Sequence, residues 1–387
     1  MKVVVAHNRY ASAQPSGENV IVDAEIAQLR AAGVTVLPFL RSSDEIAELP
    51  PVQKALLALS PIYNGAAQRG LAALLRDERP DLLHLHNPYP LLSPWVVRTA
   101  HAHGVPVMQT VHNYRQVCAP GLYFRDGAVC QECRGRRFAL PAIQHACYRG
   151  SRAQSAVMAT TLALHRGTWH SVDRYLALTD AIAAHLRDYG IPAERIVVKP
   201  NAVADPGAPP AHPGDGFLFA ARLSPEKGLG LLLEAWRRHP DGALGALRIA
   251  GDGPQAPLAR AAAAERGDVE YLGPLDAPAV RAAIRAAACV VAASTWHDVL
   301  PTIVIEALAN GRPVLGTAMG GIPYLLGTPP AGWLVEPDPD AMAAGLAVAH
   351  AEAAGLATVA RRRYETTFSP GLLTQRLIDI YTEVARG

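Results

Sequence analysis

The residues best suited to chemistry begin with a short cationic loop in the second half of the chain. Arg222 and Lys227 follow an apolar run, residues 217–221, and precede a helical segment that starts near Gly228. An arginine fork and a lysine point charge beside a helix N-terminus can flank a pyrophosphate. The spacing alone is weak support, because a surface salt bridge would place the same two residue types together.

Two carboxylates stand further along, eight residues apart. Asp298 lies on a predicted loop after a buried strand, and Glu306 lies in the helix that follows and stops near Gly311. From these two positions they could hold different hydroxyl groups of one elongated ligand, with phosphate on the N–H groups of the loop and the first helical turn. Glu306 could instead be a surface or helix-pairing residue, but its apolar neighbours favour burial, and a buried carboxylate needs partners.

A separate pattern, C-x11-C-x2-C-x13-C, lies in Arg-rich irregular sequence and consists of Cys118, Cys130, Cys133 and Cys147. The x2 spacing is typical of zinc ligands, the outer two cysteines could complete a tetrahedral site, and His145 could substitute for one of them. The alternative is a set of free thiols packed under a loop. Cys289 lies in an apolar strand and is expected to be a core residue.

Histidines gather where strands are predicted to end. His7 follows the first strand, and His84 and His86 flank the end of another. They could meet a ligand, but satisfied structural histidines fit the same positions.

Strands and helices alternate along the chain and would place these side chains. The first half has an expected helix at 18–32 and expected strands at 2–6, 34–39, 81–86 and 105–111. The second half has expected strands at 217–221, 247–250, 269–272, 289–293, 313–316 and 333–335. Short apolar strands between helices predict two doubly wound parallel α/β sheets.

A Pro- and Gly-rich stretch separates the two halves. We expect an N-terminal acceptor-side domain at 1–200, a linker at 201–215, and a nucleotide-sugar-binding domain at 216–387 whose last helix packs back on the first. Two such domains are expected to face each other across a cleft, where open α/β sheets place ligands.

Composition excludes several classes of protein. The 387 residues are 50% hydrophobic and 18% charged, with a formal net charge of +2, which predicts a soluble globular protein and no nucleic-acid partner. No run of about 18 apolar residues is uninterrupted and no secretory signal is evident, so we expect a cytoplasmic protein. Five cysteines are too few for a disulfide scaffold.

Charge is unevenly distributed. Residues through Pro200 carry 21 Lys and Arg against 15 Asp and Glu, whereas the remainder carries 15 against 19. Between Arg115 and Arg152, seven arginines meet only two acids. This stretch could face an anionic acceptor or an anionic membrane at the inner face, or it could be an ordinary solvated surface.

Taken in order, these features resemble the retaining, nucleotide-sugar-dependent family 4 glycosyltransferases of the GT-B fold. The resemblance covers nearly the whole chain. It rests on the Gly17 loop, Thr110–Tyr114, Lys199–Val203, Arg222–Gly228, Ala250–Pro254 and the Asp298-x7-Glu306 block.

The resemblance implies roles residue by residue. Arg222 and Lys227 would bind the donor diphosphate and stabilise the leaving group, Glu306 would hold the ribose, and Asp298 would hold the transferred sugar. The implied catalytic set is His112, Arg222, Lys227 and Asp298. The implied nucleotide-sugar set is Gly17, Arg222, Lys227, Gly253, Asp298, Thr302, Ile303 and Glu306. No metal and no cofactor are implied.

The sequence departs from the family pattern near the first acid. Asp298 replaces a glutamate and is shorter by about 1.5 Å, so sugar contacts could change or pass through water. Leu300-Pro301 replaces Phe-Gly, and proline has no N–H for phosphate, which leaves the amides of Thr302 and Ile303. Ala202 replaces a glycine and suggests only a changed turn.

The expected function is transfer of a hexose-type sugar from a UDP- or GDP-sugar to a hydroxyl acceptor, such as a glycan, a lipid-linked saccharide or a small metabolite. A nucleotide-sugar epimerase or a phosphorylase on the same fold would use a similar site. The substitutions at Asp298 and Pro301 also leave a non-catalytic nucleotide-sugar-binding protein as an alternative.

Overall fold

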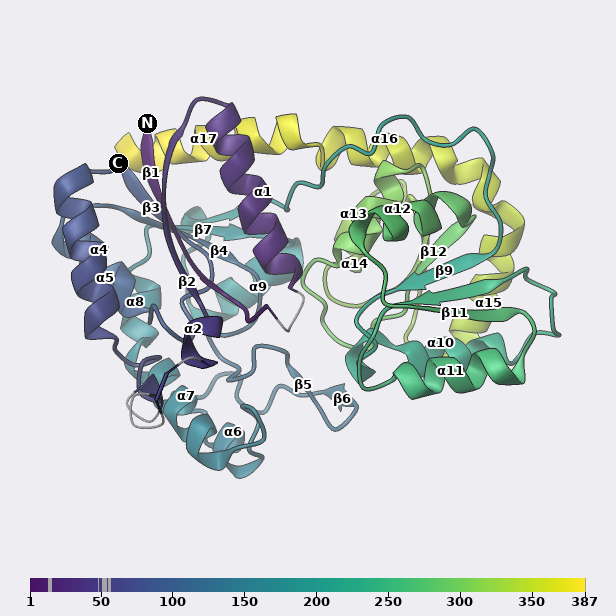
Figure 1. Ribbon diagram of the computed structural model, residues 1–387, viewed down its shortest axis with the longest axis horizontal. Coiled ribbons are helices and arrows are strands. Elements are labelled where there is room, and N and C mark those ends of the chain that lie inside the picture. Colours follow the sequence, from purple (N-terminus) through teal and green to yellow (C-terminus); the bar gives the residue numbers. More distant parts are fainter. Residues whose placement is uncertain (13–15, 48, 51–53, 55–56, 387) are drawn as a thin grey trace. The chain divides into compact units, whose positions relative to one another are not determined.

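The computed structural model describes residues 1–12, 16–47, 49, 50, 54 and 57–386. The chain divides into two compact units (Figure 1). The first unit contains Met1–Tyr123, Cys130–Ala202 and the residues from Leu373 onward. The second contains Phe124–Val129 and Val203–Leu372.

The first unit is built on a six-stranded parallel sheet with the strand order β2-β1-β3-β4-β7-β8. Its strands are β1 (Lys2–Arg9), β2 (Thr35–Ser42), β3 (Leu82–Leu85), β4 (Val107–Val111), β7 (Arg174–Ala177) and β8 (Ile196–Val198). β1 pairs on its two sides with β2 and β3, and Val3 lies opposite Val36 and Leu82. The strand order changes direction between β1 and β3, which makes that junction the topological switch point.

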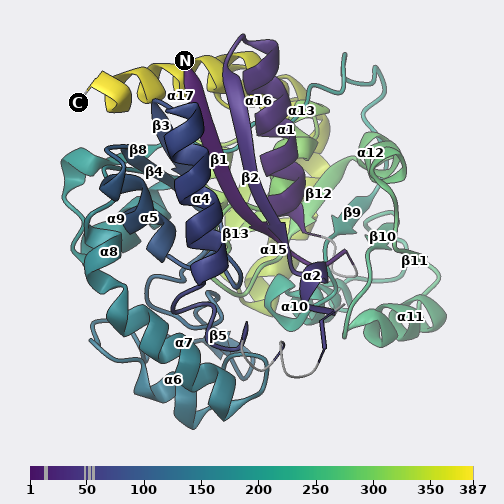
Figure 2. The same cartoon turned by 60° about the vertical axis from the view of Figure 1, so that its left-hand side comes forward.

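Helices cover this sheet because parallel strands need crossover connections. They are α1 (Gly17–Ala31), α2 (Asp44–Ala47), α4 (Gly65–Glu78), α5 (Trp95–Ala102), α6 (Leu140–Gln144), α7 (Arg152–Leu164), α8 (Arg166–His170), α9 (Asp180–Tyr189) and α17 (Pro370–Arg386). α1 lies against β1 and β2 (Figure 2). Leu377, Ile380 and Tyr381 of α17 pack in the same core as Val3 and Leu82, so the last helix is part of the first unit.

The second unit has another six-stranded parallel sheet, in the order β11-β10-β9-β12-β13-β14. Its strands are β9 (Phe217–Ala220), β10 (Leu247–Ala250), β11 (Val269–Gly273), β12 (Cys289–Ala292), β13 (Val314–Thr317) and β14 (Gly332–Val335). Its switch point lies between β9 and β12, where Phe217 pairs with Cys289.

The described part of the second unit has seven α-helices, of which the first five connect its strands and the last two follow β14. They are α10 (Leu229–Trp236), α11 (Ala256–Glu265), α12 (Ala277–Ala286), α13 (Thr302–Ala309), α14 (Ile322–Leu326), α15 (Pro339–Glu352) and α16 (Ala357–Thr367). On one face of the sheet, apolar side chains of α10, α11 and α15 pack with alternate strand residues in a core around Phe217, Trp236 and Leu315.

The prediction of two doubly wound parallel sheets is confirmed, and all six strands expected in the second half are present to within a residue or so. β7 and β8, which have four and three residues, were not foreseen. The expected cleft between the domains stays a prediction.

One stretch of the described residues passes a composition test for membrane spans. By length and composition alone, the stretch Pro339–Arg386 is apolar enough to cross a membrane, with a mean hydropathy of 1.3 over 18 residues. The stretch comprises α15, η3 (Ala353–Leu356), α16 and α17. α15 is rich in alanine and places Met342 and Leu346 in the second core, which is how a core helix meets the same criterion.

Candidate active site

In the second unit, the cationic loop and the Asp298 loop leave the two strands that flank the switch point. Lys227 ends the short helix η2 (Pro225–Lys227) that follows β9, and Asp298 lies between β12 and α13. The Thr295 amide donates to the Glu226 carbonyl at 3.0 Å and ties the loops together. Gly228 has φ +79°, and a Cβ there would lie 1.8 Å from the Ala293 carbonyl oxygen. Only glycine permits this close approach.

Lys227 and Asp298 form an ion pair across these loops. The Lys227 Nζ lies 2.5 Å from Asp298 Oδ2, to which the Ser294 hydroxyl also donates at 3.2 Å. Asp298 is buried, at 6% exposure, while the Lys227 side chain is 21% exposed and its ammonium lies 5.5 Å from the Trp296 ring centre. A bound anion would therefore share Lys227 with Asp298 or displace it.

The Arg222 guanidinium is hydrogen-bonded on one side, and most of the side chain is open to solvent. Its Nη2 donates to Glu226 Oε1 at 2.8 Å, and the Ser224 hydroxyl donates to the same oxygen at 2.6 Å. Burial of Glu226 opposes ionisation, but these donors and the arginine charge hold its pKa below the usual value. The Arg222 side chain is 61% exposed, so most of its donors remain accessible.

Helix α13 starts immediately after Pro301 and carries three of the predicted residues. The amides of Thr302 and Ile303 lie in its first turn, where helix N–H groups have no intrahelical acceptor. Burial raises the pKa of Glu306, one turn further on, while a hydrogen bond from Thr302 and the charge of Arg281 oppose the increase. A half-buried carboxylate in this position can accept hydrogen bonds from ligand hydroxyls.

Two glycines fix neighbouring loops against this site. Gly253 has φ +146°, and a Cβ there would lie 2.6 Å from the Leu223 carbonyl oxygen, which accepts a hydrogen bond from Gln255. Gly320 was missed by the sequence analysis. It has φ +56°, and a Cβ would lie 2.2 Å from the Asp298 carbonyl oxygen, although the pair Gly320-Gly321 was a visible signal.

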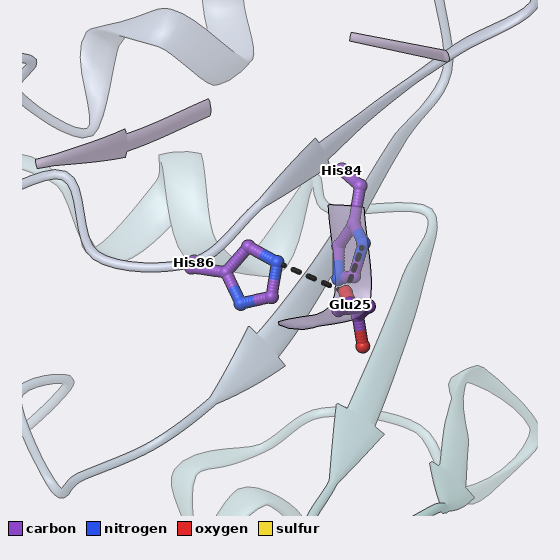
Figure 3. Close-up of side chains that lie close together, drawn as sticks. All are labelled: Glu25, His84 and His86. Carbon is purple, nitrogen blue, oxygen red and sulfur yellow. Dashed lines mark ion pairs between the residues drawn. The ribbon is translucent and has the colours of Figure 1, made fainter. Parts of the chain in front are cut away.

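In the first unit, a buried polar cluster lies at the carboxyl ends of β1, β3 and β4. Glu25 Oε1, from α1, is 3.4 Å from His84 Nδ1 and 3.3 Å from His86 Nε2 (Figure 3). Its other oxygen is 3.3 Å from Lys199 Nζ. Burial of Glu25 opposes ionisation, but Lys199 and the two histidines hold its pKa well below the usual value.

These donors lie within 4.8 Å of one another, as metal ligands do. They fit a metal poorly, because the Lys199 ammonium already neutralises Glu25 and His84 Nδ1 lies 2.7 Å from the Tyr381 hydroxyl. The cluster is therefore a buried ion pair with two histidines beside it.

His112 extends this cluster toward a small pocket. Its Nε2 lies 2.9 Å from His86 Nδ1, and the two rings stack with their centres 5.2 Å apart. Burial first, and then the neighbouring histidines, hold the pKa of His112 well below the usual value, so its ring is neutral. Glu25 favours a proton on His86 Nε2. His86 Nδ1 then accepts from His112 Nε2, and His112 Nδ1 remains an acceptor.

Glu18 and Arg115 also line this small pocket, which is partly open to solvent. The Tyr10 hydroxyl donates to Glu18 Oε2 at 3.3 Å, while Oε1 is buried without a hydrogen bond. Burial raises the pKa of Glu18 to about 7, against the opposing charge of Arg115. Gly17 was predicted from the sequence as a site residue, but its neighbour Glu18 was not.

The remaining predicted residue, Gly17, is the first residue of α1. It is exposed, and a Cβ there would meet no atom within 4 Å. Part of the loop before it, residues 13–15, lies outside the described residues. The structure thus joins Arg222, Lys227 and Asp298 through neighbouring loops of one unit, and His112 with a buried cluster in the other.

Comparison with known proteins gives two family matches in succession. The model described as "Glycosyl transferase 4-like domain" matches residues 16–202, and the one described as "Glycosyl transferases group 1" matches residues 214–352.

Among curated relatives, the chain is similar to WcaL of Salmonella typhimurium, named for colanic acid biosynthesis, with 29% identity over 232 residues. This covers 54% of the chain and 56% of WcaL. It is 30% identical over 309 residues to the 2-deoxystreptamine N-acetyl-D-glucosaminyltransferase of Streptomyces fradiae, covering 76% of the chain and 66% of that enzyme. The chain thus matches little more than half the length of WcaL.

Among solved structures, the fold is similar to that of the Anabaena protein HepE in complex with UDP-glucose. The TM-score is 0.67 at 15% identity, and the match covers 99% of this chain and 100% of HepE. This likeness identifies the GT-B fold.

Proposed function

Because the chain belongs to the family 4 glycosyltransferases of the GT-B fold, we propose that it moves a hexose from a UDP- or GDP-sugar to a hydroxyl acceptor with retention of configuration. The acceptor would be a glycan, a lipid-linked saccharide or a small metabolite. The UDP-glucose in the Anabaena neighbour supports a nucleotide-sugar donor.

The observation that carries the proposal is the position of Arg222, Lys227 and Asp298 on the two loops at the switch point of the second sheet. Open α/β sheets bind ligands outside the carboxyl ends of strands at such a point. A departing nucleoside diphosphate develops negative charge, and fixed cations beside it lower the barrier. Arg222 and Lys227 would supply that charge without a metal ion.

Other residues of the second unit would orient the donor. Glu306 would accept hydrogen bonds from the ribose, while the first-turn amides of Thr302 and Ile303 would face phosphate. Gly253 would contribute indirectly, since it lets its loop pack against Leu223 beside the cationic loop. When the diphosphate takes Lys227, Asp298 would be released to hold hydroxyls of the transferred sugar.

The first unit would supply the acceptor side. His112 Nδ1 would accept a hydrogen bond from a sugar hydroxyl, and Glu18 and Arg115 would line the acceptor pocket. The acceptor hydroxyl would attack from the face that the diphosphate leaves, and a phosphate oxygen of the leaving group would take its proton. Gly17 would let the first loop approach the donor without a side chain.

The donor assignment can be tested with the purified chain. UDP or GDP should raise the melting temperature, whereas ADP-ribose and NAD should not. Donor hydrolysis without acceptor should be measurable and should be lost in Arg222→Ala. It should be kept in Arg237→Ala, an exposed arginine of the same unit that pairs with Glu265. Indifference to all nucleotides would contradict the proposal.

Two finer points need their own measurements. The coupling constant of the anomeric proton in donor and product, read by NMR, would report retention or inversion. Full activity without added Mg²⁺ or Mn²⁺ would support metal-independent transfer. Conversion of the UDP-sugar to its epimer without acceptor would instead identify an epimerase.

We also propose peripheral contact with an anionic membrane through part of the Arg115–Arg152 stretch. Exposed Arg136 and Arg137 adjoin exposed Phe138 and Leu140, which are 42% and 50% accessible. Cations beside apolar side chains suit the surface of an anionic bilayer. The protein should sediment with anionic vesicles at low salt and be released at high salt. Equal recovery in the supernatant with anionic and neutral vesicles would contradict this contact.

A further inference from the structure

The stretch that holds four of the five cysteines has little regular structure. Between residues 113 and 151 the structure has only β5 (Phe124–Arg125), β6 (Ala128–Val129) and α6. From Asp126 to Phe138 every residue is exposed except Cys130 and Cys133. A segment with so few buried apolar side chains has little hydrophobic stabilisation, yet both cysteines are partly buried.

Backbone hydrogen bonds bring the first two cysteines together. The β5–β6 hairpin closes with a bond from the Cys130 amide to the Tyr123 carbonyl, at 2.8 Å. The amides of residues 121–123 donate toward the Cys118 sulfur. Tyr123 therefore connects Cys118 and Cys130 through its own amide and carbonyl.

Ala142 connects the other two cysteines in the same way. Its amide donates toward the Cys133 sulfur, and its carbonyl accepts from the Cys147 amide at 2.9 Å. Cys133 is close enough to interact electrostatically with Cys118, Cys130 and Cys147. All four thiols therefore share one neighbourhood, although they come from four separate turns.

We propose that Cys118, Cys130, Cys133 and Cys147 together bind one Zn²⁺ ion in a tetrahedral structural site. Four thiols lose their protons to solvent as four Zn–S bonds form, and no oxidant is needed. The amides that point at the sulfurs would stabilise the thiolates, and the surrounding arginines would offset the net negative charge.

Neither of the other arrangements open to these residues is favoured. All five cysteines are described and none forms a disulfide. His145 Nε2 lies 3.4 Å from Glu132 Oε2, so this ring pairs with a carboxylate and Cys147 takes the fourth position. Among the described residues no three cysteine sulfurs lie mutually within 4.8 Å, so metal binding requires the turns to move closer together. Zinc would then stabilise a segment whose own side-chain packing is too sparse to stabilise it.

The test is metal analysis of protein purified without added zinc. We expect about one zinc per chain, retained in Cys289→Ser and lost in Cys133→Ser. Cys289 is the matched control because it is buried in β12 of the second unit. Cobalt reconstitution should give the intense visible bands of tetrahedral thiolate coordination. Iron with sulfide, a disulfide found by mass spectrometry, or no metal with all four thiols titratable would overturn the proposal.

A second measurement covers the case in which Cys133→Ser does not fold. Release of zinc from the unmodified protein with a mercurial should speed tryptic cleavage at Arg134, Arg136 and Arg137 by at least about 10-fold. Re-addition of zinc after thiol reduction should restore protection. Cleavage at equal rates before and after metal release would overturn the structural role. These measurements do not depend on glycosyl transfer.

Discussion

The two candidate sites occupy equivalent places in two similar sheets, yet their charged side chains differ in exposure. In the second unit, Lys227 and Arg222 are partly exposed, and each meets one carboxylate on a loop. In the first unit, Glu25 and Lys199 are buried and pair beneath two histidines. An exposed cation can exchange its internal partner for a ligand, whereas a buried pair is too costly to separate. The comparison thus distinguishes a site suited to binding an anion from one suited to fixing a neutral ring.

The largest expected effect is on catalysis by Arg222→Ala. Loss of an exposed cation at the diphosphate should lower kcat by about 100-fold or more, with little change in stability. Steady-state kinetics and a thermal melt of the same preparation check both parts. Arg237→Ala should match the unmodified protein, and equal activity of the two variants would remove Arg222 from the site.

Glu25→Gln tests the buried member of the comparison. It leaves the Lys199 charge unpaired, so the free energy of unfolding should fall by about 3 to 5 kcal/mol at pH 7. Because the pKa of Glu25 is depressed in the folded state, the stabilisation is present above the usual carboxyl pKa and is lost as pH falls through the folded value. Urea titrations at pH 7 and pH 4 should show the difference shrinking at the lower pH.

Glu18→Gln should increase the free energy of unfolding at neutral pH, whereas Glu25→Gln should lower it. The pKa of Glu18 is raised to about 7, so the folded state keeps a proton that the unfolded chain releases, and stability falls as pH rises from about 4.5 to 7. Above pH 7 the amide should stabilise the protein by up to about 3 kcal/mol. Melting temperatures from pH 5 to 8.5 measure this. A parallel pH dependence in both proteins would contradict it.

The smallest effect is the most specific. Asp298→Asn frees Lys227, so UDP or GDP should bind roughly 3- to 10-fold more tightly, while sugar transfer falls. Calorimetric titration measures the affinity, with Asp241→Asn, an exposed partner of Arg266, as the control. Weaker nucleotide binding by Asp298→Asn would show that Lys227 does not leave Asp298 to bind the diphosphate.

Local patterns predicted the second unit well and the first unit less completely. The residues of the cationic loop and the Asp298 loop lie in short, recognisable segments, but the Lys227–Asp298 pair joins positions 71 apart and could not be read from either segment. Glu25 is one of several acids on α1. Only the packing of that helix against β1 and β2 places Glu25 beside His84 and His86.

Gly253 was named from the family resemblance, but the physical reason for a glycine there was not predicted. The resemblance placed it at the ligand, and the structure adds a local reason, since its loop approaches Leu223 too closely for any side chain. Glu18 gave no signal because its raised pKa arises from burial, which composition around it does not reveal.

The last helix has a consequence for how the chain acquires its shape during synthesis. Leu377 and Tyr381 complete the core that begins with Val3, and the Tyr381 hydroxyl meets His84 at 2.7 Å. A ribosome must therefore synthesise the residues through Tyr381 before the unit that contains Val3 can finish folding. Until then its exposed apolar surface would be a target for chaperones.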